Sequence, residues 1–452
     1  MTVLRIRDAP IHAARLSSVL GTMAVASLLG TSGQTWAGGI SLYEAGHEGS
    51  GLANAGAAVL ATDPSVLMSN PAGISKLKGT QINANAQFIV GGISFSRDGD
   101  NTFDGGNGGN PLPYLPGSSF FISHEVNDKA SIGFGMYGNF GLAVDYDDDW
   151  AGRYFTQESA IIGLSFQPTY AYKINEDLSI GFGPRLMYTY FRTEVAINNN
   201  VLGQFNTPDG QLRYKDADWG VGFNIGLLYD LDERTRLGLA YTSKIKLEFE
   251  DQAELKDITN PVLRLGLNRL DAQGLSLDMT VPQTVLASLS YQLDPQWTLL
   301  SSVGWQDWSE FGKIGVEVDS DALGNVSTTA DRQYKDTWHL SLGAQNQINK
   351  QWRWSVGVGY DSSAVDDEDR TVDNPMGENW RLATGVNYAL DANTDLHFAY
   401  TLVWLGDMPD QQTKNTGGSL SGEYSNAALH MLGGGGCLAL LSQRLIEHEP
   451  AQ

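Results

Sequence analysis

Hydrophobic residues alternate with small or polar residues along most of the chain after residue 80, most clearly in segments 219–231 and 352–360. Because successive side chains of a strand point to opposite faces, this period predicts strands with one apolar face. Fourteen such segments are predicted: 80–95, 118–126, 130–142, 161–174, 177–197, 211–231, 234–250, 275–293, 296–318, 333–349, 351–361, 379–391, 394–405 and 423–433. The pattern therefore predicts an all-β protein.

The connections between these segments alternate between short turns and long polar loops. The short turns include 127–128, 175–176, 294–295, 349–350 and 391–393. The long loops are 96–117, 143–160, 198–210, 251–274, 319–332, 362–378 and 406–422. This sorting, together with an even number of strands, is typical of an outer-membrane barrel with its turns in the periplasm. We therefore expect a fourteen-stranded antiparallel transmembrane β-barrel, which satisfies every backbone group in hydrocarbon.

Four tryptophans near the predicted strand ends, Trp297, Trp352, Trp380 and Trp404, suit the aromatic girdles of such a barrel. Their alternative interpretation is ordinary packing within a β core.

Residues 1–37 have the features of a signal peptide. Arg5, Arg7 and Arg15 precede an apolar run over 16–29, and residues 35–37 supply a cleavage site. The run is too short for a lasting membrane helix. We expect an exported chain that begins near Gly38 and lies in the outer membrane of a Gram-negative bacterium.

Composition agrees with a chain of many strands and turns, because glycine accounts for 52 of 452 residues and Lys+Arg for only 29. The formal net charge of -23 argues against a nucleic-acid partner, which requires a basic face. The single cysteine, Cys437, excludes a disulfide within the chain, and we expect it to be a bystander thiol.

Two steps ahead of the strands, Asp63-Pro64 and Asn70-Pro71, each combine an N-cap residue with a proline suited to the first helical position. Helices this short need a surrounding wall. A fourteen-stranded barrel leaves an aqueous lumen unless something fills it. We therefore predict a plug over 38–79 and a barrel over 80–433.

The start of the predicted mature chain, GGISLYEAGHEGSGLANAGAAVLATDPSVLMSNPAGISKL, contains Asn70, Pro71 and Ala72. It resembles the N-terminal hatch of the FadL/TodX (OMPP1) family of outer-membrane transporters for long-chain fatty acids and other hydrophobic compounds. Segments 281–314, 334–345 and 352–365 are similar to later strands of that family, so the likeness runs from about residue 38 to residue 432.

The resemblance implies that ligand is captured between the long loops, enters an internal apolar pocket and leaves sideways at a kinked third strand. The corresponding stretch here, Gly138, Asn139, Phe140 and Gly141, matches the kink region of the family, and glycine is common where a strand bends. The alternative is that these glycines merely suit a crowded barrel wall. The expected partners are hydrophobic small molecules and outer-membrane lipid, with a monomeric protein and no cofactor or metal.

A fatty-acid carboxylate would need a cation inside the barrel. Strand register places several cations on the inner face, and Lys335 falls on a position where the family's pocket has a basic residue. Arg192 lies in a comparable family segment, although its register is ambiguous. The candidate ligand-binding residues are Lys335, Arg381, Lys244, Lys246, Arg192 and His339. Alternatively, these are lumen cations balanced by nearby carboxylates.

Other functions remain open at this stage. The substrate is either a long-chain fatty acid or an aromatic or alkane hydrocarbon, and a general porin is a further alternative. An outer-membrane lipid-modifying enzyme is disfavoured, because GHEGSG (46–51) lacks G-x-S-x-G spacing and His47-Glu48 has no second histidine. The acidic loop clusters 145–149 and 366–369 could hold divalent cations or be solvated loop charge.

The alternation ends at Gly433, and the remaining GGGCLALLSQRLIEHEPAQ lacks the aromatic closing strand of such barrels. We therefore expect residues 434–452 to form an atypical tail. This puts closure between the first and last strands in doubt and predicts a low yield in the membrane.

Overall fold

The computed structural model describes residues 43–112, 114–200, 207–261, 263–264, 274–318, 326–414 and 418–440. The predicted signal peptide and its cleavage site lie outside these residues, as does the end of the predicted tail. None of the described helices is long and apolar enough to cross a membrane.

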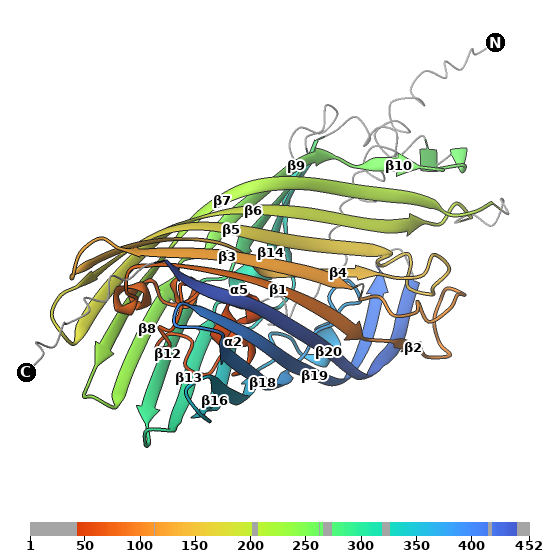
Figure 1. Cartoon of the computed structure of the whole chain (residues 1–452). Coiled ribbons are helices and arrows are strands. Elements are labelled where there is room, and N and C mark those ends of the chain that lie inside the picture. Colours follow the sequence, from red (N-terminus) through yellow and green to blue (C-terminus); the bar gives the residue numbers. More distant parts are fainter. Residues whose placement is uncertain are drawn as a thin grey trace, which may run out of the picture.

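The described strands form a closed antiparallel barrel (Figure 1). Its sheet has sixteen strands. Two of them are short and lie outside the ring: β2 (Phe95–Arg97) pairs only with β20, and β10 (Glu254–Lys256) pairs only with β7. The ring itself consists of β1 (Thr80–Gly92), β3 (Leu115–Glu125), β4 (Ala130–Asp145), β5 (Glu158–Lys173), β6 (Leu178–Ile197), β7 (Gly210–Asp230), β8 (Thr235–Thr242), β12 (Thr284–Gln292), β13 (Trp297–Gln306), β16 (Thr337–Gln347), β17 (Trp352–Asp361), β18 (Asn379–Ala389), β19 (Thr394–Lys414) and β20 (Gly418–Leu440). The predicted fourteen-stranded barrel is therefore confirmed.

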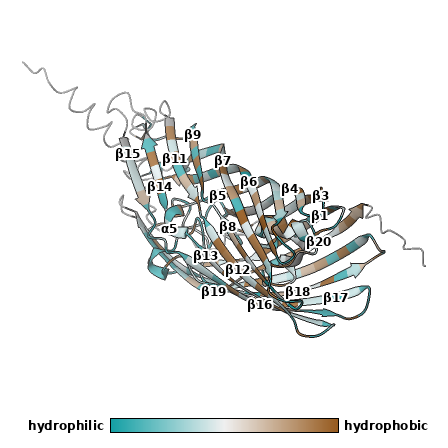
Figure 2. Ribbon diagram, turned by 90° about the vertical axis from the view of Figure 1, so that its left-hand side faces the viewer, coloured by the Kyte–Doolittle hydropathy of each residue, from teal (hydrophilic) through white to brown (hydrophobic). Residues whose placement is uncertain are grey.

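Alternate residues of the ring face outward, and most of these are apolar. On β7, Trp219, Val221 and Phe223 are exposed, whereas Gly220 and Asn224 between and after them are buried. Figure 2 shows hydrophobic positions recurring along the strands of the wall. The barrel therefore presents an apolar outer surface, as the period of two predicts.

A second sheet lies at the end of the barrel that carries the long connections, here called the outer end (Figures 1 and 2). Its strands run in the order β15 (Val326–Asp331), β14 (Lys313–Val318), β11 (Gly274–Val281) and β9 (Ile245–Gln252). Three predicted strands, 234–250, 275–293 and 296–318, are therefore wrong as single strands. Each is divided between the ring and this sheet, and the third is interrupted by α5 (Trp308–Phe311).

The hydrophobic pattern does not reveal the breaks between β8 and β9 and between β11 and β12, because apolar residues occupy odd-numbered positions on both sides of each break. Leu237 and Leu239 are apolar and exposed on β8, whereas Ile245 and Leu247 are apolar and buried on β9. The two residues between β8 and β9 turn the same set of positions from the outer surface toward an internal core. A sequence period records which positions are apolar and not which core they enter.

Residues 43–79 lie inside the ring, where the plug was predicted. They form η2 (Tyr43–Ala45), α2 (His47–Ser50), α3 (Val66–Ser69) and η3 (Pro71–Lys76), and Leu52, Leu67 and Ile74 are fully buried. Asn70 caps η3, and its side chain accepts a hydrogen bond from the Ala72 backbone amide at 3.0 Å. The predicted helix start at Asp63-Pro64 is wrong, because α3 begins at Val66 and its N-cap is Ser65.

The wall satisfies the plug's backbone and lets it approach closely. The Ser302 hydroxyl donates to the Asn54 carbonyl at 3.0 Å, and the Thr401 hydroxyl donates to the Ser50 carbonyl at 2.6 Å. At Gly357 a Cβ atom would lie 2.1 Å from a plug carbonyl oxygen, so only glycine fits there without a shift. Such contacts pay the cost of burying a mostly irregular backbone.

The last strand ends at Leu440, and the predicted strand end at Gly433 is wrong. β20 pairs with β1 from Ala428 opposite Gly92 to Leu440 opposite Thr80, so the ring closes through residues assigned to the tail. The glycines at 433–436 hide the alternation, but Leu432, Leu438 and Leu440 keep the same parity and are exposed. Backbone hydrogen bonds form the ladder whether or not a side chain is present.

Candidate functional site

A cavity of about 110 Å³ lies between the plug and the barrel wall. The plug contributes Tyr43, Asn54, Met68 and Ser69. The remaining lining residues are Phe140, Arg185, Ala240, Thr242, Val281, Pro282, Thr284, Val285, Leu286, Gly304, Trp305, Gln306 and His339. The lining contains many apolar side chains and, among the described residues, no aspartate or glutamate.

Above the cavity, toward the second sheet, the interior is aromatic. Phe140 stacks on Trp308 with ring centroids 6.4 Å apart and meets Phe311 edge-on at 5.7 Å. These rings belong to a large buried cluster that also contains the inner face of the second sheet. An apolar environment therefore extends from the outer end of the barrel to the cavity.

The wall is irregular beside Phe140. β3 and β4 pair only as far as Ser119 opposite Tyr137, so the outer part of β4 has no ladder partner on β3. On its other side, β4 pairs with β5 at Tyr137 and again at Phe140, which places Gly138 and Asn139 opposite one residue of β5. This is a β-bulge at the predicted kink region, and such bulges bend a strand and end its pairing.

A buried charge network joins the plug to the opposite wall. Arg381 donates from Nη1 to Glu44 Oε1 at 2.5 Å and from Nε to Asp361 Oδ2 at 2.8 Å. Its guanidinium also lies over the Tyr43 ring, 4.7 Å from the centroid. The predicted inward orientation of Arg381 and His339 agrees with their burial, but both side chains are already engaged.

The same network places Ser341, His339 and Asp361 in one hydrogen-bonded chain. His339 Nδ1 lies 2.8 Å from Asp361 Oδ1, and His339 Nε2 lies 3.1 Å from the Ser341 hydroxyl. This is the order of groups in an acyl-transfer triad. However, Ser341 is buried and does not line the cavity, and Asp361 also serves Arg381 and Tyr43.

The other predicted cations do not line the cavity. Lys335 precedes β16, is exposed and pairs with Asp366. Lys244 and Lys246 are also exposed, because the chain leaves the ring after β8, so their predicted inward orientation is wrong. Arg192 forms an ion pair with Glu158 at 2.5 Å. Of the six candidates, only His339 is among the lining residues.

The sequence analysis missed Arg185, the one lysine or arginine among the described lining residues of the cavity. The alternation of side chains along β6 could have identified Arg185 as an inward-facing cation. Phe182 and Leu186 face outward, so odd-numbered residues of this strand face inward, and Arg185 is one of them. Arg192, the candidate chosen from its likeness to the family, has the opposite parity on this strand.

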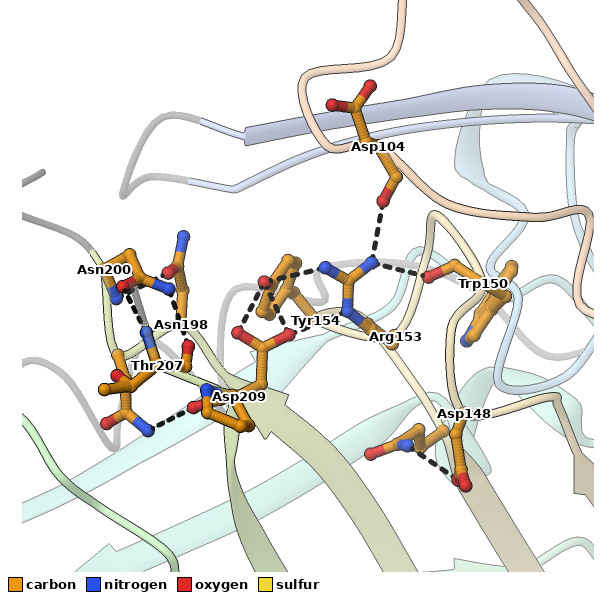
Figure 3. Close-up of polar contacts among 12 residues, drawn as sticks. Asp104, Asp148, Trp150, Arg153, Tyr154, Asn198, Asn200, Thr207 and Asp209 are labelled. Atoms are coloured by element: carbon orange, nitrogen blue, oxygen red, sulfur yellow. Dashed lines mark hydrogen bonds and ion pairs between the residues drawn. The ribbon is translucent and has the colours of Figure 1, made fainter. Parts of the chain in front are cut away.

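Arg153 links the outer loops (Figure 3). Its Nε donates to Asp209 Oδ2 at 2.8 Å, and its Nη1 donates to the Asp104 carbonyl at 2.8 Å. Tyr154 donates its hydroxyl to the same Asp209 carboxylate at 2.7 Å, and burial followed by this hydrogen bond raises the pKa of Tyr154 to about 12. The contacts hold three separate loops together over an acidic surface cavity of about 560 Å³.

Acidic groups at the outer end are of two kinds. Among the described residues, Asp366, Glu368 and Asp369 bring carboxylate oxygens within 4.8 Å of one another, but Asp366 is already paired with Lys335. Asp410, beyond Trp404 on β19, is instead buried, and burial raises the pKa of its carboxyl to about 8. The loop carboxylates therefore include both solvated and buried groups.

Comparison with known proteins identifies the family that has this architecture. A family model described as "Outer membrane protein transport protein (OMPP1/FadL/TodX)" matches residues 28–433. The "Long-chain fatty acid transport protein" of Escherichia coli O6:H1 is 27% identical over 423 residues, covering 87% of this chain and 92% of the relative. "Outer membrane protein P1" of Haemophilus influenzae is 26% identical, covering 77% and 84%.

Solved structures share the fold. A Pseudomonas aeruginosa FadL homologue aligns with a TM-score of 0.77 and 20% identity, covering 88% of this chain and 98% of that one. The Pseudomonas putida toluene transporter TodX aligns with a TM-score of 0.65 and 15% identity, covering 89% and 100%. The plugged barrel and the family match agree, and the chain belongs to the OMPP1/FadL/TodX family of outer-membrane transport proteins.

Proposed function

We propose that this protein takes up hydrophobic compounds across the outer membrane, with long-chain fatty acids as the main cargo and aromatic or alkane hydrocarbons as the alternative. The observation that carries the proposal is the position of the cavity. It lies under an aromatic core and beside the irregular part of β4, with Phe140 contributing to all three. The names of the relatives from Escherichia coli and Pseudomonas putida support the same class of cargo.

The proposed route begins at the outer loops, continues through the cavity and ends sideways between β3 and β4. Exposing apolar surface to water costs about 25 cal/mol for each Å². A solute that passes directly from the cavity into the lipid avoids this cost in the periplasm. The missing β3–β4 ladder beyond Tyr137 supports this exit, because it leaves a place in the wall without backbone pairing.

We further propose that the protein is a transporter and neither an enzyme nor an open porin. The plug occupies the lumen and is hydrogen bonded to the wall, which argues against free diffusion. The Ser341–His339–Asp361 chain serves plug docking in this proposal, because Ser341 does not line the cavity. Ring closure within one chain supports a monomer whose outer face contacts lipid.

A reversible cross-link tests the lateral exit. Ser118 and Gly138 are the next residues beyond the last β3–β4 pair, and the single natural thiol is removed by Cys437→Ser. Uptake of a labelled long-chain fatty acid is measured in a deletion strain that expresses S118C/G138C. Oxidation should block uptake, and a reductant should restore it.

The matched control is H124C/I132C, a pair already in register on the outer face of the β3–β4 ladder. Its oxidation should leave uptake unchanged. Full uptake by S118C/G138C whose disulfide has been verified after oxidation would refute the lateral exit. Hydrolysis of phospholipid by the purified protein would refute the transporter assignment instead.

A further inference from the structure

We propose that Arg185 binds the carboxylate of the cargo in the cavity, which makes the protein selective for long-chain monocarboxylates over neutral hydrocarbons. The inference rests on the proposed uptake function and deepens it by naming the substrate class. It concerns a residue that lies on the inner face of β6 and contributes to the cavity lining.

Arg185 differs from the other buried arginines in its partners. The described residues include four buried arginines, Arg185, Arg332, Arg370 and Arg381. Arg332 pairs with Asp373 at 3.2 Å, Arg370 pairs with Asp367 at 2.6 Å, and Arg381 pairs with two carboxylates. No described carboxylate forms an ion pair with Arg185, whose charge has only the neutral Tyr137 hydroxyl beside it.

The immediate surroundings leave the guanidinium without an anion. The residue directly opposite it on β7 is Gly222, which has no side chain. The neighbouring Gln167 is already used, because its amide donates to the Leu67 carbonyl at 2.7 Å and its oxygen accepts from Tyr137 at 2.6 Å. Arg185 Nε is buried and has no hydrogen-bond partner among the described groups.

An arrangement of this kind is costly unless an anion completes it. An arginine remains protonated in a protein, so it cannot escape burial by losing its charge. A buried charge without a partner costs several kcal/mol, and natural structures avoid it. Among the described residues the surrounding wall supplies no counter-ion, so the cavity is preorganised for an anion that arrives from outside.

The shape of the site favours a carboxylate with an apolar tail. A guanidinium presents a planar fork of donors that matches the two oxygens of a carboxylate. The cavity lining also contains apolar groups such as Met68, Leu286 and Phe140, which suit an alkyl chain. His339 cannot replace Arg185 as the anion site, because Asp361 already occupies it at 2.8 Å.

The test compares two ligands of equal chain length in the purified full-length protein. Hexadecanoate carries the carboxylate, and hexadecanol is its neutral counterpart. Affinities are measured for wild type, Arg185→Gln and Arg185→Lys. The matched control is Arg234→Gln, the same substitution at an exposed arginine in the turn before β8.

The wild type should bind hexadecanoate more tightly than hexadecanol. Since hydrogen bonds to charged groups are the strong ones, Arg185→Gln should weaken hexadecanoate binding about tenfold to a hundredfold. The same variant should bind hexadecanol as the wild type does, which also shows that its cavity is intact. Arg185→Lys should recover part of the loss, and Arg234→Gln should change neither affinity.

Two results for Arg185→Gln would overturn the inference while leaving the uptake function intact: unchanged hexadecanoate binding, or equal losses for both ligands. Wild-type protein that binds hexadecanol as tightly as hexadecanoate would also overturn it while leaving hydrophobic uptake intact. Wild-type protein that binds neither ligand would instead refute the uptake function on which the inference rests.

Discussion

Asn70 holds the plug against the wall, and its replacement by alanine should loosen that contact. The side chain is completely buried. Its Nδ2 donates to the Ala58 carbonyl at 2.7 Å within the plug and to the Leu227 carbonyl of β7 at 2.9 Å. Its Oδ1 accepts from the Ala72 amide at 3.0 Å, which caps η3. One side chain therefore connects two plug segments and one wall strand.

Only the hydrogen bond to the Leu227 carbonyl joins the plug to the wall, whereas the other two hold the plug segments together. A hydrogen bond contributes about 1 kcal/mol net, and a buried group left without a partner costs about 1–3 kcal/mol. Asn70→Ala should therefore weaken plug docking by about 1–3 kcal/mol. Since about 1.4 kcal/mol corresponds to a factor of ten, the undocked fraction should rise roughly fivefold to a hundredfold.

The assay is ion conductance of the purified barrel in planar bilayers. Asn70→Ala should show channel openings much more often than wild type, at unchanged single-opening size. The control is Asn346→Ala, the same substitution on β16 outside the plug contact. A heat-modifiable Asn70→Ala barrel with wild-type conductance would show that Asn70 does not hold the plug.

Three further predictions concern the ion-pair network of Arg381, the contact between Gly357 and the plug, and the buried carboxyl of Asp410. Arg381→Leu leaves the Glu44 and Asp361 carboxylates buried without their cation, so it should lower the free energy of unfolding by about 3–5 kcal/mol, measured as a shift of the urea midpoint. Gly357→Ala places a Cβ atom 2.1 Å from a plug carbonyl oxygen and should increase protease cleavage of the plug; unchanged cleavage would contradict the close contact. Burial raises the pKa of Asp410 to about 8 from an ordinary carboxyl value near 4, so its stabilising protonated form is complete below about pH 4 and is lost as pH rises through 8. Asp410→Asn should therefore raise the urea midpoint relative to wild type above pH 8 and leave it unchanged below pH 4.

The sequence by itself determined the strand period, the strand number and the outward face. On β7 the alternation from Trp219 onward predicts an apolar outer surface, and the structure has it. These properties are local, because the direction of each side chain depends only on its position along its own strand. The Asn70-Pro71 step was readable for the same reason, since a cap acts on the next few residues.

Tertiary structure decided which core each apolar face enters and which charges find partners. Ile245 continues the parity of Leu239, yet one faces the internal core and the other faces outward. Lys335 and Arg381 were both candidate inward cations in the sequence, but only Arg381 meets Glu44 and Asp361. Such pairings join segments more than 300 residues apart, as Glu44 and Arg381 show.

The closing strand β20 and Arg185 show most clearly what the sequence alone does not determine. The glycine run after Leu432 carries no side-chain pattern, so only pairing with β1 reveals that the strand continues to Leu440. The inward orientation of Arg185 could be read from parity, but its lack of a carboxylate depends on neighbouring strands and on the plug. The period of the sequence specifies the direction of each side chain. The charge balance around Arg185 and the closure of the barrel depend on distant segments that only folding brings into contact.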